Sequence, residues 1–233
     1  MEIFVGTSGW AYSWNTGGSL QWYTDNTELN AIELNASFYR FPYPSQVKGW
    51  AVKGKNLKWA IKVSRRITHL HKFDGEARDI WIRFKELFAP LDNLTEFYLF
   101  QLPPSTTPKD LSKILEFYSF TSLGKKFALE PRNIQWYEKS IIDEIRGAGI
   151  TWVSINAPKL PTDIINTSGT VYLRMHGKAA WYSYDYSTEE LMEIAQKIKD
   201  VNPERVFVFF NNNHAMLKNA LEMLHTLRRT ILL

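Results

Sequence analysis

The chain has 233 residues, of which 45% are hydrophobic and 22% are charged, a composition that suits a globular protein with a core of ordinary size. It contains no cysteine, which excludes disulfide bonds, thiolate catalysis and cysteine-ligated zinc. The net charge of +4 only slightly favours an anionic partner, whereas aromatic residues, at 15%, are unusually frequent. The start of the chain lacks a signal sequence and no segment has the apolar length of a membrane span, so we expect a cytoplasmic protein without membrane contact.

Segments with strand character recur along the whole chain. They cover residues 2–9, 31–39, 58–65, 96–103, 126–132, 151–157, 170–177 and 205–212. Segments with helical spacing separate most of them, at residues 76–91, 108–120, 140–149, 187–200 and 214–229. Ser187 with Glu190 forms a capping box, and Gly149 suits the end of a helix.

This alternation predicts the fold. Strands that alternate with helices pair in parallel through crossover connections. The absence of a linker or a repeat favours a single (β/α)8 TIM-barrel-like domain over residues 1–233, with an open doubly wound sheet as the main alternative. The connections before Ala31 and between Asn156 and Thr170 are short, so one or two barrel helices are expected to be missing or irregular.

The stretch IELNASFYRFP, residues 32–42, alternates between apolar and polar side chains. Its apolar set is Ile32, Leu34, Ala36 and Phe38, and its polar set is Glu33, Asn35 and Ser37. The outer face of a barrel strand packs under helices and is apolar, so the polar set is expected to point inward. Because buried charges are costly and barrel enzymes work at the C-terminal mouth, the polar set is expected to line a site there.

The same test of strand faces brings polar residues inward from other strands. The inward set comprises Lys62, Ser64, Glu130, Arg132, Ser154, Asn156, Arg174 and His176. Gln101 and Asn211 share a face with phenylalanines, so their direction is less clear. Glu33 and Glu130 thus lie among several cations, which would lower the carboxylate pKa values and attract a phosphate, sulfate or carboxylate group.

Aromatic residues gather in the segments that follow the strands. They include Trp10, Tyr12, Trp14, Trp136, Tyr137, Trp181, Tyr182, Tyr184 and Tyr186. Such rings beside cations suit stacking on bases or on sugar faces, although they can equally pack loops against the barrel. Asn211 to Asn213 can cap the last helix or bind a phosphate at its start.

Seven motifs together carry a family resemblance. They read GTSGWAY, IELNASFYRFP, KVSRRITH, FQLPPS, ALEPRNIQWY, YLRMHGKAAWYSYDYSTEEL and FNNNHAMLKNAL. In this order they resemble the YecE-like family, domain of unknown function 72. The resemblance implies a TIM-barrel-like fold and a polar pocket, with no settled activity. The positions that match the pocket motif are Glu33, Asn35, Tyr39, Arg40, Lys62, Thr68, His69, Gln101, Glu130, Arg132, Arg174, His176, Asn211 and Asn212.

The leading hypothesis is an enzyme that hydrolyses an anionic, phosphate-bearing substrate, for instance a nucleic-acid phosphodiester. Glu33, Glu130 and His176 are its candidate catalytic residues, with a divalent metal such as Mg²⁺ or Mn²⁺ as a possible cofactor. The candidate substrate-binding residues are Asn35, Tyr39, Arg40, Lys62, His69, Gln101, Arg132, Trp136, Arg174, Asn211 and Asn212.

Two alternatives stay open. The first is a glycoside-processing enzyme that uses Glu33 and Glu130, with Trp10 and Trp136 as sugar platforms. The second is a protein that binds an anionic metabolite without catalysis, in which the carboxylates only order the cations. His176 can be a proton shuttle or a structural residue.

Overall fold

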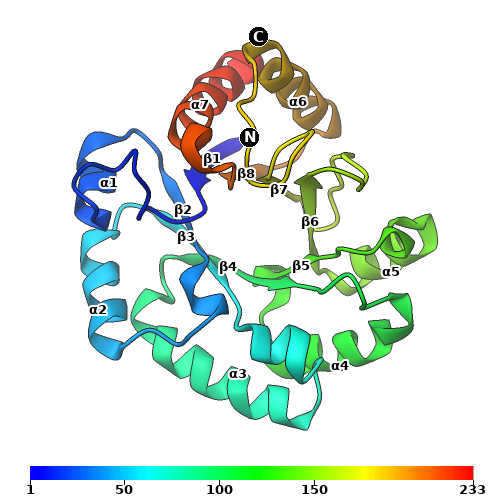
Figure 1. Ribbon diagram of the computed structural model, residues 1–233. Coiled ribbons are helices and arrows are strands. Elements are labelled where there is room, and N and C mark those ends of the chain that lie inside the picture. The colour runs from blue at the N-terminus through cyan, green and yellow to red at the C-terminus, as the bar shows by residue number, and fades with distance from the viewer. Residues whose placement is uncertain (233) are drawn as a thin grey trace.

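The structure, a computed structural model that describes residues 1–232, is a closed barrel of eight parallel strands in the order β1 to β8 (Figure 1). The strands are β1 (Glu2–Thr7), β2 (Ala31–Leu34), β3 (Lys58–Lys62), β4 (Thr95–Gln101), β5 (Phe127–Glu130), β6 (Thr151–Asn156), β7 (Thr170–Met175) and β8 (Arg205–Phe210). Pairing of β1 with β8 closes the ring. The predicted (β/α)8 architecture is therefore confirmed, and the open sheet is excluded.

Helices form the outer layer of the barrel (Figure 1). They are α1 (Leu20–Asn26), α2 (Pro44–Lys53), α3 (Gly75–Phe88), α4 (Leu111–Thr121), α5 (Lys139–Ala148), α6 (Thr188–Val201) and α7 (Met216–Leu232). As expected, α1 is short, and residues 157–169, all of them described, connect β6 to β7 without a helix. None of the helices within residues 1–232 is both long and apolar enough to cross a membrane.

Sequence signals at the helix ends act as predicted. Ser187 caps α6 in a reciprocal capping box with Glu190, and Gly149 ends α5 in the left-handed conformation, with a φ of 79°. Gly6 has a different role, because a β-carbon there would collide with the carbonyl of Ala31 on β2. The close approach of β1 and β2 thus requires a glycine at this position.

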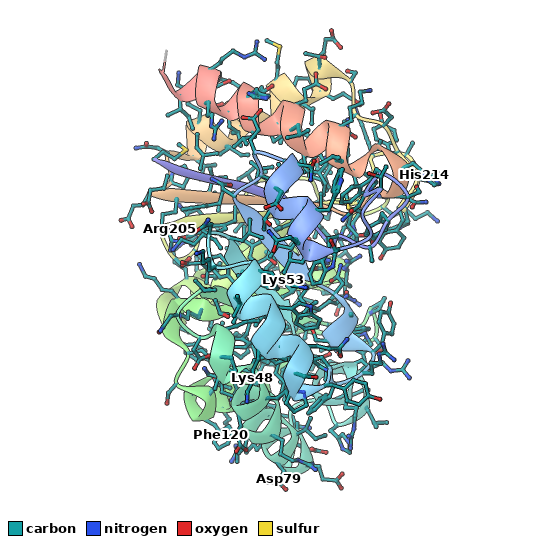
Figure 2. All side chains as sticks on the ribbon, turned by 90° about the vertical axis from the view of Figure 1, so that its left-hand side faces the viewer. Lys48, Lys53, Asp79, Phe120, Arg205 and His214 are labelled. Atoms are coloured by element: carbon teal, nitrogen blue, oxygen red, sulfur yellow. The ribbon has the colours of Figure 1, made fainter. Side chains whose placement is uncertain are left out.

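The interior of the barrel is filled by apolar side chains. This inner cluster consists of Ala31, Ala60, Phe97, Leu99, Ala128, Val153, Tyr172, Phe207 and Phe209, with Phe4 packed against it. At the N-terminal end Arg205 pairs with Glu2 and Glu96 and covers the Phe4 and Phe207 rings. Figure 2 shows the two ends of the barrel, with Arg205 at the start of β8 on one side and His214 beyond its end on the other. The inward residues nearer the C-terminal end form the site.

Two strands differ from the predicted alternation. In β6, Val153 belongs to the inner cluster, so Ser154 and Asn156 point outward and the prediction for them was wrong. Strand β2 ends at Leu34 and residues 36–38 form a 3₁₀ helix, so Ala36 is exposed and the alternation does not continue beyond Leu34.

Candidate functional site at the mouth of the barrel

Arg174 lies at the centre of a buried ion network inside the barrel. Its Nε and Nη2 atoms donate to the two oxygens of Glu33 at 2.9 and 2.7 Å, and its Nη1 donates to Glu130 at 2.5 Å. The side chains of all three residues have no exposed surface. Arg174 therefore joins the two carboxylates, which come from β2 and β5, and balances one of their two negative charges.

Glu33 has two further donors. The Ser8 hydroxyl donates to one carboxylate oxygen at 2.5 Å, and the Tyr172 hydroxyl donates to the other at 2.7 Å. Each oxygen of Glu33 thus accepts two hydrogen bonds, which satisfies a buried carboxylate. Ser8 and Tyr172 were missed by the sequence reasoning, although both lie two residues from an inward position on their own strands.

Glu130 continues the network toward the loops. Its second oxygen accepts a hydrogen bond from Arg132, whose guanidinium also contacts the His176 Nε2 atom at 3.1 Å. The Trp181 ring packs against the same guanidinium, 4.6 Å from its centre. Tyr182 lies next to this ring and donates its backbone N–H to the carbonyl of His176, which places the loop from β7 to α6 over the site.

The charges of this network set the ionisation of its members. Burial raises the pKa of Glu130, but the charges of Arg132, Arg174 and Lys62 outweigh it and lower this pKa to about 2. Burial, together with the same three cations, holds the pKa of His176 well below its ordinary value. Glu130 is therefore ionised and His176 is neutral at physiological pH.

A cavity of about 310 Å³ opens at the C-terminal end of the barrel. It is lined by Tyr12, Asn35, Tyr39, Lys62, Tyr182, Asn211 and Asn213. These residues follow β1, β2, β7 and β8 or end β3, so the cavity lies where barrel enzymes bind their ligands. Lys62 is the one charged residue among those that line it.

Lys62 is held in an unusual environment at the end of β3. Its side chain is 8% exposed and its Nζ lies 4.0 Å above the centre of the Phe38 ring. Among residues 1–232 no carboxylate oxygen lies within 4.0 Å of this Nζ. Burial, followed by the charge of Arg174, lowers the Lys62 pKa from 10.5 to about 7, although Glu130 and Glu33 act in the opposite direction.

The structure brings most of the predicted site residues to the mouth. Asn35, Tyr39, Lys62 and Asn211 line the cavity, while Glu33, Glu130, Arg132, Arg174 and His176 form the network below it. Gln101 follows Phe97 and Leu99 of the inner cluster, so it also points inward. His69 is half-buried beside Phe38, and burial together with the charge of Lys62 lowers its pKa to about 4.

Four residues that were predicted to bind the ligand are not placed to contact a molecule in the cavity. Trp136 has no exposed surface and donates its indole N–H to the carbonyl of Thr106, so it cannot stack on a ligand. Asn212 is buried and donates to the Tyr184 carbonyl and to Asn219. Arg40 is exposed and is not among the residues that line the cavity. Arg174, which was expected to hold a phosphate, is occupied by the two carboxylates.

Metal binding was predicted only as a possibility, and it stays a prediction. Within residues 1–232 no group of three or more His, Asp or Glu side chains is arranged to hold a metal ion. The guanidinium of Arg174 occupies the position between Glu33 and Glu130 that a shared metal ion would need.

Comparisons with known proteins agree with the fold. The family model described as "Protein of unknown function DUF72" matches residues 4–231. A DUF72 family protein from Enterococcus faecalis V583 has a TM-score of 0.82 and 21% identity, over 97% of this chain and 95% of that chain. A DUF72 family protein from Thermotoga maritima MSB8 has a TM-score of 0.81 and 23% identity, over 100% of both chains.

A more distant structure shares the barrel alone. The 3-keto-D-glucoside 4-epimerase YcjR from E. coli has a TM-score of 0.59 and 12% identity, over 98% of this chain and 99% of that chain. At this identity the likeness shows the fold and carries no activity over. The chain matches none of the curated proteins.

Proposed function

The chain belongs to the DUF72 family, whose description gives no activity, and we propose that the mouth of its barrel binds a small anionic ligand through Lys62. The observation that carries this proposal is the unpaired ammonium of Lys62 on the wall of the cavity. A buried cation without a counter-ion is costly, and a bound anion would supply the missing charge. The other lining residues offer amide and phenol groups that can donate hydrogen bonds to the same anion.

In this proposal the two carboxylates, Glu33 and Glu130, position the arginines and do not touch the ligand. Because Arg174 and Arg132 bind them, Glu33 and Glu130 would order the cations rather than repel the ligand. No carboxylate is among the residues that line the cavity, so an anion there would meet no like charge on its walls. Hydrolysis that uses Glu33 or Glu130 as a base would first require one of these ion pairs to open.

The size of the cavity favours a small molecule over a nucleic acid. About 310 Å³ lies at the lower end of the range for ligand pockets. Nucleic-acid grooves depend on many phosphate contacts along an extended basic surface, whereas this site presents a single buried ammonium. The proposed ligand is therefore a compact metabolite with a carboxylate, phosphate or sulfate group.

Sulfate is a suitable probe because its charge stays constant between about pH 6 and pH 9. Isothermal titration should detect sulfate binding that weakens as the pH rises through the Lys62 pKa of about 7. Lys62→Met should abolish this binding at every pH. Lys48→Met is the matched control, since Lys48 is exposed on the outer helix α2 (Figure 2).

Equal affinity of the wild-type protein and Lys62→Met for sulfate would refute the proposal. So would the absence of binding at millimolar sulfate. Tight, salt-sensitive binding of oligonucleotides that Lys62→Met leaves unchanged would point to the outer surface instead.

A further inference from the structure

The amine of Lys62 is suited to a reaction that goes beyond anion binding. An amine in an ion pair stays protonated, but the carboxylates nearest to Lys62 are already bound to Arg174 and Arg132. The charged groups around it are Glu33, Glu130, Arg132 and Arg174, with the neutral ring of His176 in their network and the neutral ring of His69 beside Phe38. Its pKa of about 7 leaves roughly half of the amine uncharged at neutral pH.

An uncharged buried lysine amine is a nucleophile toward carbonyl groups. We propose that Lys62, which lies on the cavity wall, forms a Schiff base with the ketone or aldehyde group of a small 2-oxo acid. This inference rests on the proposed anion site and adds a covalent step to it. The geometry that supports it is the place of Lys62 among the residues that line the cavity, with its Nζ 4.0 Å above the centre of the Phe38 ring and no carboxylate of the described residues within 4.0 Å.

The single cation on the cavity wall selects the substrate class. The carbonyl carbon must meet Nζ, and the anionic group must lie close to the same nitrogen, because no second cation lines the cavity. A 2-oxo acid meets both conditions, since its carboxylate is bonded directly to the carbonyl carbon. The positively charged iminium that forms would then hold the carboxylate in an ion pair.

Neighbouring side chains can assist the reaction. The side-chain Oδ1 of Asn35 accepts a hydrogen bond from Arg174 Nη2 at 3.4 Å, which leaves the side-chain N–H groups of Asn35 available to the ligand. The Tyr12 hydroxyl also lines the cavity, but it donates its proton to the Ser8 carbonyl at 3.2 Å, so the Asn35 amide supplies the donors. Such donors can stabilise the oxygen of the carbonyl as it gains charge.

The step balances without an oxidant or a reductant. The Nζ lone pair attacks the carbonyl carbon, the C–O π electrons move to oxygen, and proton transfer from nitrogen to oxygen gives a carbinolamine. A proton from solvent water then binds the carbinolamine hydroxyl, which leaves as water while the nitrogen lone pair forms the C=N bond. One uncharged amine, one carbonyl group and one proton thus give one protonated imine and one water molecule.

Reductive trapping tests the inference. Sodium cyanoborohydride with pyruvate or glyoxylate should attach the reduced adduct to the peptide that contains Lys62, as measured by mass spectrometry. At neutral pH the yield at Lys62 should exceed that at exposed Lys48 by more than about tenfold, because an ordinary lysine is almost fully protonated there. Acetone, which has the carbonyl but no charge, should give a much lower yield.

Two measurements separate the covalent step from anion binding. Lactate has the carboxylate without the carbonyl, so it should bind and give no adduct. Lys62→Arg keeps the charge and should retain sulfate binding, but its guanidinium cannot form a Schiff base. Sulfate or lactate binding without any pyruvate or glyoxylate adduct at Lys62 overturns this inference and leaves the anion site standing. Labelling of Lys62 and Lys48 to the same extent also overturns it, and failure of all anions to bind overturns both proposals.

Discussion

The Arg174→Met substitution should destabilise the protein strongly. Methionine fills part of the volume of arginine but removes the charge that holds Glu33 and Glu130 together. Glu33 keeps the hydroxyl donors Ser8 and Tyr172, and Glu130 keeps Arg132. Two buried carboxylates would then face one remaining guanidinium.

The magnitude follows from the bonds that are lost. Arg174 donates to Glu33 at 2.7 and 2.9 Å and to Glu130 at 2.5 Å, and all three side chains are fully buried. Removal of one partner from a buried ion pair costs about 3–5 kcal/mol, and here one arginine serves two carboxylates. We therefore expect a loss of at least about 3 kcal/mol in the free energy of unfolding.

Urea denaturation of the purified variants measures this loss. The triple variant Glu33→Gln, Glu130→Gln, Arg174→Met should regain part of the stability, because it leaves no uncompensated carboxylate. Arg228→Met is the control, since Arg228 pairs with Glu28 on the surface and its loss should cost less than about 1 kcal/mol. A cost for Arg174→Met as small as that of the control would refute the assigned role of the network.

Further predictions concern pH and the loop over the site. Lys62 has a folded pKa of about 7 against 10.5, so the unfolded chain binds more protons between these values and stability should rise with pH there. Urea denaturation should show a rise of about 3 kcal/mol from pH 7 to about 9.5 that Lys62→Met lacks, and parallel profiles would contradict it. Glu130, with a folded pKa of about 2 against 4.5, stabilises the fold above pH 4.5, and this stability should be lost as the pH falls toward 2. Glu130→Gln should show less of this acid loss, and an unchanged acid transition would argue against it. Gly177→Ala should cost at least about 1 kcal/mol in thermal or urea unfolding, because Gly177 has a φ of 118° and a β-carbon would collide with the Ala180 carbonyl. A fully stable variant would show that this loop can rearrange.

The sequence predicted the barrel and most of the site because strand side chains alternate in direction. In β2, β3, β5 and β7 the outward face is apolar and the inward face ends in a charged residue. The alternation of side chains therefore identified Glu33, Lys62, Glu130 and Arg174. The same rule, extended by one pair of residues toward the N-terminus of β7, would also have found Tyr172. In β1 the same alternation leads from the inward Phe4 to Ser8, four residues later, but Ser8 lies just beyond the end of the strand.

The prediction of inward and outward side chains failed in β6 because the connection that follows this strand forms no helix to cover its outer face. The outward face of β6 packs under the irregular residues 157–169, whose backbone needs hydrogen-bond partners that a helix would have satisfied internally. Ser154 accepts a hydrogen bond from the backbone N–H of Ile165, and Thr167 accepts one from the N–H of Trp152. Asn156 accepts a hydrogen bond from the hydroxyl of Tyr186, which lies in the loop between β7 and α6. Polar residues on the outer face of β6 therefore indicate that an irregular segment, and not a helix, covers the strand. The short connection before Thr170 was the sequence signal for this missing helix.

The pairing of charges could not be read from the sequence, since it depends on which side chains meet across the interior of the barrel. The alternation along the strands turns Glu33, Lys62, Glu130 and Arg174 inward, but it does not say which of them pair. Arg174 on β7 presents three donors and bonds both carboxylates, whereas neither carboxylate has an oxygen within 4.0 Å of the Lys62 Nζ. The branched shape of one arginine thus leaves Lys62 without an ion-pair partner in the described chain, and Lys62 lines the cavity.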